Sequence, residues 1–442
     1  MTSGALLKQK QSFTDPNDAQ RRAADPACSV WVGASAGSGK TKVLTDRVLR
    51  LLLPREDGSP GTQSHRILCL TFTKSAAGEM RLRLSARLSE WSVMDEIKLN
   101  ENLSALLGRP PKGDEIHAAR GLFAAVIDAP GGLNIMTIHA FCQSVLGRFP
   151  LEAGLPPHFE ALDESAAALL FNRARNDVMA QARRAHGSDL GRALHALAAV
   201  TAEDGFEKLM QDVAGESRTF RELLNQHGGL DKIDTLTRTT LGLTPGEDED
   251  TVLLAACRDG MYDERGLRES VRVLSECGTD ATDRPAADAI QKWLDTAAEQ
   301  RVLLWAAYRD AFLTQQGTAR KNLPTKKPQA AFPDIVNILA AESDRVIKAE
   351  ERRKCARCAA LTHHLLVLGD AILNSYEKLK ASRAALDFND LINKTLTLLE
   401  RRDMASWVMF KLDGGLDHIL VDEAQDTNPE QWRIIAALCD DF

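Results

Sequence analysis

The chain has 442 residues, of which 44% are hydrophobic and 26% are charged, and this composition is typical of a soluble globular protein. A chain of this length exceeds one compact core, so we expect two or three domains. No apolar run approaches the length needed to cross a bilayer, and Met1–Lys10 lacks the apolar core of a signal peptide, which indicates a cytoplasmic protein. The formal net charge of −7 leaves a nucleic-acid partner open, because acidic loops can lie far from a basic working face.

A short helix is expected at the start of the chain, before the first strand. Pro16 suits the first helical position, with Thr14 or Asp15 as its N-cap, and the helix would carry Gln20. A glutamine amide can donate one hydrogen bond to an adenine edge and accept another. An exposed helix glutamine with no such role is the commoner explanation of this residue taken alone.

The segment Val30–Thr41 begins with an apolar run, which we expect to form the first strand. Small residues and then a Gly-Lys-Thr triplet follow. It fits the phosphate-loop pattern G-x-x-x-x-G-K-[ST], except that Ala34 replaces the first glycine. Backbone N–H groups at a helix N-terminus can surround phosphate oxygens, while Lys40 reaches the terminal phosphates and the Thr41 hydroxyl ligates Mg2+. An ordinary glycine-rich turn is the alternative. The residues of this loop expected to hold the nucleotide are Ala34, Ser35, Ala36, Gly37, Ser38, Gly39, Lys40 and Thr41.

Two more strand and helix pairs follow the phosphate loop. Residues 66–73 form a buried strand before a helix, and residues 133–142 form a strand that runs into a helix. This order predicts a parallel α/β unit, in which the strand ends share one edge and ligands bind at that edge. We therefore expect Thr71, Phe72 and Thr73 near the nucleotide. His139 would share this edge, although a histidine at a strand end is more often structural.

The composition changes along the chain in a way that indicates two kinds of domain. Residues 156–385 have helical periodicity and few β-branched runs, so we interpret them as a mainly helical domain inserted into an α/β domain. The α/β domain would comprise residues 1–155, with a helical excursion at about 91–130, and would return at residues 386–442. The basic cluster Ala319–Lys327 can contact phosphates or form a solvated loop.

A second apolar strand, Leu416–Val421, ends in Asp422 and Glu423. Asp422 can hold Mg2+ through its water shell, while Glu423 can orient and deprotonate an attacking water. Together with the lysine of the phosphate loop, this strand favours an ATPase over a protein that only binds nucleotide.

Five segments, taken in order, resemble the motifs of the UvrD/Rep-like superfamily 1A DNA helicases. They are Asn17–Gln20, Ala34–Thr41, Leu70–Arg81, Thr137–Phe141 and Val421–Asn428. The flanking residues 129–142, Arg148–Pro157 and Leu386–Ile392 look like the AddA subunit of bacterial AddAB helicase-nucleases. The resemblance implies an α/β fold, with a P-loop NTPase (RecA-like) parallel-sheet domain and a large helical insertion. It also implies an ATP-dependent 3′ to 5′ DNA helicase or translocase subunit of double-strand break repair and recombination.

The resemblance also implies roles for individual residues. Gln20 would select adenine, Asp422 and Thr41 would hold Mg2+, and Lys40, Glu423 and Gln425 would be catalytic, with Gln425 sensing the terminal phosphate. The single-stranded DNA track would be lined by Thr71, Phe72, Thr137 and His139, where an aromatic ring can stack on a base. Lys74 and Ser75 stand where relatives often have Asn-Lys, which leaves the DNA contact of Lys74 open.

The implied partners are ATP and Mg2+, single- and double-stranded DNA, and a nuclease or helicase subunit of the AddB type, with no membrane. The chain ends at Phe442, before the second motor domain and the nuclease domain of the family. Because an arginine finger contributes about 10³–10⁵ in rate, we expect this chain to bind ATP weakly and hydrolyse it poorly. The alternatives are a RecB-like or UvrD-like helicase, or a non-catalytic fragment that binds ATP or DNA without turnover.

Overall fold

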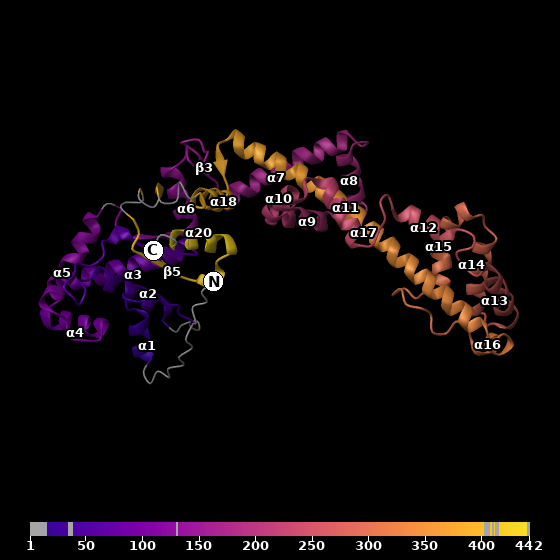
Figure 1. Ribbon diagram of the computed structural model, residues 1–442, viewed down its shortest axis with the longest axis horizontal. Helices are drawn as coiled ribbons and strands as arrows, with labels where there is room; N and C mark the ends of the chain where they lie inside the picture. The colour runs from indigo at the N-terminus through magenta and orange to yellow at the C-terminus, as the bar shows by residue number, and fades with distance from the viewer. Residues whose placement is uncertain are drawn as a thin grey trace, which may run out of the picture. The chain divides into compact units, whose positions relative to one another are not determined.

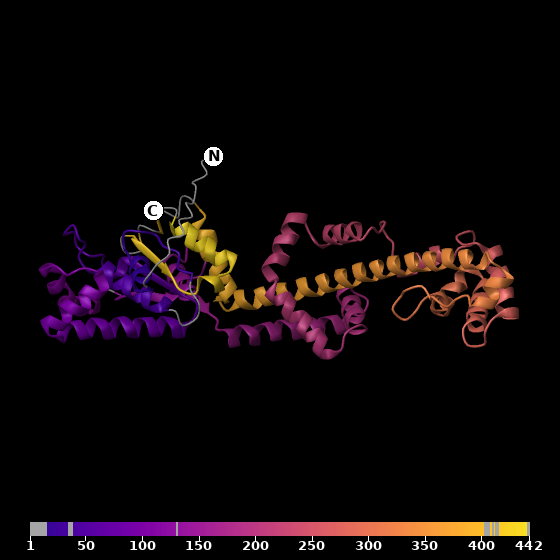
Figure 2. The same ribbon diagram turned by 90° about the horizontal axis from the view of Figure 1, so that it is seen from below.

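The computed structural model describes residues 16–33, 39–129, 131–401, 407–408, 411 and 415–439. The chain divides into two compact units, shown in Figures 1 and 2. Unit 1 contains the described residues up to Leu169 and from Lys380 onward, and unit 2 is Leu170–Leu379. Ala34–Ser38 of the expected phosphate loop, and the expected N-cap residues Thr14 and Asp15, lie outside the described residues.

Unit 1 combines short parallel strands with surrounding helices (Figure 1). Its helices are α1 (Pro16–Ala23), α2 (Lys40–Leu52), α3 (Lys74–Val93), α4 (Glu96–Leu107), α5 (Gly113–Asp128), α6 (Ile138–Arg148), α18 (Phe388–Leu399) and α20 (Pro429–Cys439). Its strands are β1 (Ile67–Thr71), β2 (Asn134–Thr137), β3 (Glu160–Ala161), β4 (Ala385–Leu386) and β5 (His418–Val421), and 3-10 turns occur at η1 (Ser64–Arg66) and η2 (Ala424–Asp426).

The main sheet of unit 1 has three parallel strands in the order β2-β1-β5. Side chains alternate along β1, so that Ile67 and Cys69 pack with α2–α5, while Leu68 and Leu70 pack with α6, α18 and α20. Helices therefore cover both faces, and all five residues of β1 are buried, as expected for a strand in a parallel sheet. The parallel unit predicted from residues 66–73 and 133–142 is present.

Two details of the sequence prediction for unit 1 are wrong. Residues 29–33 form no strand, and Trp31 is 75% exposed. An apolar run becomes a strand only where a neighbouring strand can pair with it, and within the described residues the sheet stops at β5. In addition, His139 lies in the first turn of α6 and not at a strand end, because the Thr137 side chain caps this helix by accepting a hydrogen bond from the Ala140 N–H.

Unit 2 is helical, apart from an isolated bridge between Leu313 and Ala319 within its described residues. Its helices include α7 (Glu164–Arg184) and α17 (Ile335–Ser382), whose first and last residues, respectively, belong to unit 1. The others are α8 (Asp189–Ala198), α9 (Glu203–Gly215), α10 (Ser217–His227), α11 (Leu230–Thr240), α12 (Glu249–Cys257), α13 (Glu264–Cys277), α14 (Asp283–Leu294), α15 (Ala298–Phe312) and α16 (Lys326–Ala331). Figure 1 shows α12–α16 gathered around the first part of α17, where Trp293 stacks on Tyr308 with ring centroids 3.9 Å apart. A separate core joins α7–α9 to a later part of α17.

One described helix is long and apolar enough to cross a membrane by length and composition alone. It is α17, whose most apolar 18-residue window has a mean hydropathy of 1.2, and 33% of that window is buried inside the structure. This differs from the expectation that no run approaches such a length. Leu368 and Ile372 of α17 are nevertheless buried in the core with α7–α9, which is the packing of a helix in a folded domain.

A buried lysine links the end of α17 to the start of α18 in unit 1. Asp387 caps α18 by accepting from the Asp390 N–H at 2.9 Å, and the Asp390 carboxylate accepts from the Asp387 N–H at 3.1 Å. The Lys380 ammonium, whose side chain is only 3% exposed, lies 2.9 Å from the Asp387 carboxylate and 2.5 Å from that of Asp390. One buried cation therefore balances the two carboxylates that form the cap.

We expect Lys380→Met to lower the free energy of unfolding of unit 1 by about 3 kcal/mol, because the two buried carboxylates then lack a compensating positive charge. Urea unfolding monitored by circular dichroism measures this. Lys378→Met is the matched control, since Lys378 is exposed on the same helix. Equal effects of the two substitutions would contradict a stabilising role for this buried ion pair.

Candidate nucleotide site and the adjacent strand edge

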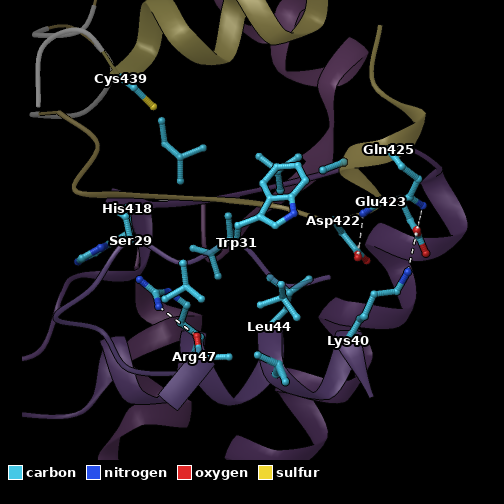
Figure 3. Close-up of a pocket in the computed structure, with 18 of the residues that line it drawn as sticks. Ser29, Trp31, Lys40, Leu44, Arg47, His418, Asp422, Glu423, Gln425 and Cys439 are labelled. Carbon is cyan, nitrogen blue, oxygen red and sulfur yellow. Dashed lines mark hydrogen bonds and ion pairs between the residues drawn. The ribbon is translucent and has the colours of Figure 1, made fainter. Parts of the chain in front are cut away.

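Helix α2 presents one face to a cavity of about 660 Å³ (Figure 3). Its N-cap, Gly39, has a φ of 91°, a left-handed conformation that favours glycine. Lys40, Val43, Leu44 and Arg47 recur at the spacing of one helix face, and all four line the cavity. The start of α2 therefore delivers the lysine of the expected phosphate loop into this space.

The opposite wall of the cavity comes from the end of β5. The Asp422 N–H donates to the Leu70 carbonyl at 2.8 Å and extends the ladder by one residue. Glu423 then adopts φ 50° and ψ 45°, a left-handed conformation that costs a non-glycine residue about 1–3 kcal/mol. This turn takes the chain off the sheet edge, and the Glu423 carboxylate lies 3.5 Å from the Lys40 ammonium (Figure 3).

The two neighbouring carboxyl groups have different electrostatic environments. The side-chain amide of Gln425 donates to the Glu423 carboxylate and, with Lys40, lowers the pKa of Glu423. Burial raises the pKa of Asp422, although a hydrogen bond from the Glu423 N–H to its carboxylate opposes this shift. Glu423 is thus held as a paired anion, while Asp422 is a half-buried carboxylate at the strand end.

These residues suit a nucleotide with a divalent cation. A lysine ammonium at a helix N-terminus complements phosphate, and carboxylate oxygens are the ligands that Mg2+ prefers. Gln425 also lines the cavity with Lys40, Asp422 and Glu423. Thr41 follows Lys40 in the first turn of α2 but is not among the described residues that line the cavity.

Gln20 lies beside the start of α2. Its side-chain nitrogen is 3.1 Å from the point where a Cβ on Gly39 would stand, and the Lys42 ammonium donates to its side-chain oxygen at 3.1 Å. The helix predicted around Gln20 is present among the described residues as α1, Pro16–Ala23. The structure therefore brings Gln20 next to the expected phosphate loop, although Gln20 does not line the cavity among the described residues.

The strand register places the expected DNA residues next to the carboxylates. Thr71 pairs with Thr137, and Val421 pairs with Leu70, so Asp422 follows directly beside Thr71. Thr71, Phe72 and Asp422 also line one small cavity of about 10 Å³. The candidate nucleotide site and the candidate DNA edge are therefore neighbours at the carboxyl end of the sheet, as the parallel topology predicts.

The residues expected to bind DNA differ in the solvent exposure of their side chains. Thr71 is 3% and Thr137 is 6% exposed, and both hydroxyls serve local structure: Thr71 donates to the Thr73 carbonyl at 3.1 Å, and Thr137 caps α6. Phe72 is 45% exposed at the end of β1. The phenyl ring of Phe72 is therefore the accessible group here, while the two hydroxyls shape the backbone beneath it.

Sequence reasoning missed a contact between His139 and Phe388. The two rings stack with centroids 4.6 Å apart and planes tilted by 30°, and Phe388 is 38% exposed. The signal for this placement is the Asp387-x-x-Asp390 capping pattern, which sets Phe388 at the first position of α18. Burial lowers the pKa of His139.

Residues 16–442 match the family described as the UvrD/REP helicase N-terminal domain. The chain belongs to the UvrD/REP helicase family. This confirms the resemblance seen in the five sequence segments, and the family implies a P-loop NTPase fold, consistent with the small parallel sheet of unit 1.

Curated relatives of this UvrD/REP family chain are AddA proteins, which are named as subunits of an ATP-dependent helicase/nuclease. The protein of Lactiplantibacillus plantarum is 25% identical over 93% of this chain and 33% of its own length, and that of Pelotomaculum thermopropionicum is 26% identical over 92% and 31%. The protein of Latilactobacillus sakei subsp. sakei is 26% identical over 93% of this chain and 46% of its own length. The chain therefore spans less than half the length of these relatives.

The half-buried ring of His139 leads to a pH prediction. Its folded pKa lies below the ordinary value of 6.5, so its contribution to stability is complete above that value and is lost as the pH falls through it. The His139→Gln variant carries no such group. We therefore expect wild type to lose more stability than His139→Gln between about pH 7 and about pH 5, as measured by urea unfolding.

The control for this prediction is His117→Gln, which removes an exposed imidazole from α5. It should keep the pH dependence of the wild type. Parallel pH profiles for wild type and His139→Gln would show that protonation of His139 does not oppose folding.

Proposed function

We propose that this UvrD/REP family chain is the first motor domain of an ATP-dependent DNA helicase or translocase subunit, with an inserted helical domain, acting in double-strand break repair and recombination. The observation that supports the proposal most directly is the approach of Lys40 to Glu423 across one cavity, beside Asp422 at the end of a parallel strand. A 3′ to 5′ direction, a partner subunit of the AddB type and a cytoplasmic location belong to the same proposal.

In this proposal each polar residue of the cavity has one task. Lys40 binds the terminal phosphates, Asp422 and Thr41 hold Mg2+, and Glu423 removes a proton from the attacking water. The bound Mg2+ supplies neutralising charge to the phosphate oxygens. Gln425, which donates to the Glu423 carboxylate, orients this base and senses the terminal phosphate.

The ion pair between Lys40 and Glu423 implies that nucleotide binds before Glu423 acts as a base. The hydrogen bond from Gln425 and the nearby Lys40 ammonium both lower the pKa of Glu423, so Glu423 is a weaker base while Lys40 lies beside it. An incoming triphosphate attracts the Lys40 ammonium and releases the carboxylate. Binding of nucleotide thereby prepares the base that hydrolysis needs.

The proposed DNA track lies at the neighbouring strand ends. Phe72 offers an exposed ring for base stacking, worth about 1–3 kcal/mol per base. His139 continues the track with Phe388 stacked against it, and Thr71 and Thr137 hold the turns. Single- and double-stranded DNA are both proposed ligands of the complete protein, with the single strand at this edge.

The test is single-turnover ATP hydrolysis, with and without DNA, by this chain and by an intact homologue carrying the equivalent change. We expect Glu423→Gln to slow hydrolysis by the homologue about 10²–10⁴-fold while ATP still binds, because only the proton acceptor is removed. Glu90→Gln, on the exposed face of α3, is the control. Unchanged hydrolysis by the Glu423→Gln homologue would refute its assignment as the base, and ATP binding without turnover by every wild-type form would favour a passive binding fragment.

The basic segment of unit 2 extends the proposal to DNA phosphates. Residues 311–333 contain no acidic residue, and Lys321, Lys326 and Lys327 are exposed and form no ion pair with other described residues. Replacing these three lysines by alanine should weaken binding of duplex DNA and reduce the slope of log K against log salt by about 2–3, since each phosphate contact releases a counterion.

Fluorescence anisotropy over a salt series measures this slope. The matched control replaces Arg268, Arg272 and Arg284 by alanine, because these arginines are already paired with carboxylates of unit 2. The control removes the same charge. Equal slopes for the two triple variants would point to the net charge of unit 2 and not to a phosphate-binding segment.

A further inference from the structure

Two arginines of α2 fasten the end of α1 and the turn that follows it. Arg47 donates from Nη1 to the carbonyls of Ala23 at 3.3 Å and Asp25 at 2.6 Å, and from Nη2 to the carbonyl of Cys28 at 2.5 Å. Arg50 donates to the Arg21 carbonyl at 2.8 Å. Four backbone carbonyls of one short segment therefore accept hydrogen bonds from a single helix.

These side-chain contacts hold the end of α1 and the backbone after it, which lies in no helix or strand up to residue 33. The last carbonyls of a helix have no partner within the helix, and a cation near them also complements the helix dipole. Residues 29–33 lie in no strand, so no ladder of backbone hydrogen bonds fixes the chain leading to the phosphate loop. The fork of the Arg47 guanidinium reaches several acceptors at once and holds the preceding segment, Ala23–Cys28.

Arg47 shares a cavity and a helix face with Lys40 but has a different orientation. Figure 3 shows the two residues at opposite ends of the cavity, with Arg47 beside Ser29 and His418 and Lys40 beside Glu423. The Arg47 guanidinium is occupied by three carbonyls of the chain itself. Its donors are therefore directed at the backbone and not into the space beside the carboxylates.

The clamped segment carries Gln20. Its side chain packs against the N-cap of α2, 3.1 Å from the Cβ position of Gly39, and receives the Lys42 ammonium. The position of Gln20 relative to Lys40 is thus set by how α1 sits on α2. Within that pairing, Arg47 makes three of the hydrogen bonds that cross from one segment to the other.

We propose that Arg47 is a positioning residue for adenine recognition. It holds α1 against the phosphate-loop helix, so that the Gln20 amide and the Lys40 ammonium meet the base and the phosphates of one nucleotide. Arg47 itself does not contact the nucleotide. This inference rests on the proposed function, in which Gln20 is the adenine contact.

The test compares the affinity of the chain for ATP with its affinity for inorganic tripolyphosphate, both with Mg2+, by isothermal titration calorimetry. Arg47→Met should weaken ATP binding roughly tenfold, equivalent to about 1.4 kcal/mol, and leave tripolyphosphate binding unchanged, because the phosphate contacts of Lys40 remain. Arg47→Lys should not restore ATP affinity, since one ammonium cannot span three carbonyls. Arg83→Met, which removes an exposed arginine of α3, is the control and should match the wild type.

A double substitution identifies the route by which Arg47 acts. In a Gln20→Ala background, Arg47→Met should cause no further loss of ATP affinity, because the contact that it positions is already gone. An additive loss would overturn the proposal, as would an equal loss of ATP and tripolyphosphate in Arg47→Met or an unchanged ATP affinity. A wild-type chain that binds neither ligand would instead refute the nucleotide site, and with it this inference.

Discussion

The ion pair between Lys40 and Glu423 joins two parts of the chain that are 383 residues apart. Lys40 opens α2, and Glu423 follows the last strand of the sheet, so the pair forms only when β5 lies beside β1 in the observed register. The helical unit 2 is inserted between these two parts in sequence. The proposed nucleotide site therefore depends on β5 pairing with β1, and this pairing maintains the strained left-handed backbone at Glu423.

Parallel pairing imposes the same constraint on the proposed DNA edge. Because Thr71 pairs with Thr137 and Asp422 follows beside Thr71, a shift of one strand would move both the Asp422 carboxylate and the exposed ring of Phe72. The buried hydroxyls of Thr71 and Thr137 hold the turns at this edge. The Asp422 carboxylate and the Phe72 ring therefore depend on the same strand register.

Local patterns predicted the parts of the site that local forces determine. Helix α1 around Gln20, helix α2 after Gly39, and the acidic end of β5 all follow from helical periodicity, glycine placement and apolar runs. The strand expected from Val30 onward is absent over the described residues 30–33, because β propensity has no effect without a partner strand. The stacking of Phe388 on His139 escaped prediction because it joins residues that only the tertiary fold brings together.

Arginine and lysine side chains show why charged residues are hard to interpret from sequence. Arg47, Lys380 and the exposed Lys321 look alike as basic residues, yet the first serves backbone carbonyls, the second is buried between two aspartates, and the third faces solvent. Their surroundings determine their energies, because a hydrogen bond to a charged group contributes more when water is excluded. Arg47 lies beside a segment that has no strand partner, and Lys380 lies beside the cap of α18. Their charge thus stabilises the irregular segments that lead into the phosphate loop and into α18, so the polar architecture of the site extends well beyond the residues that would touch a nucleotide.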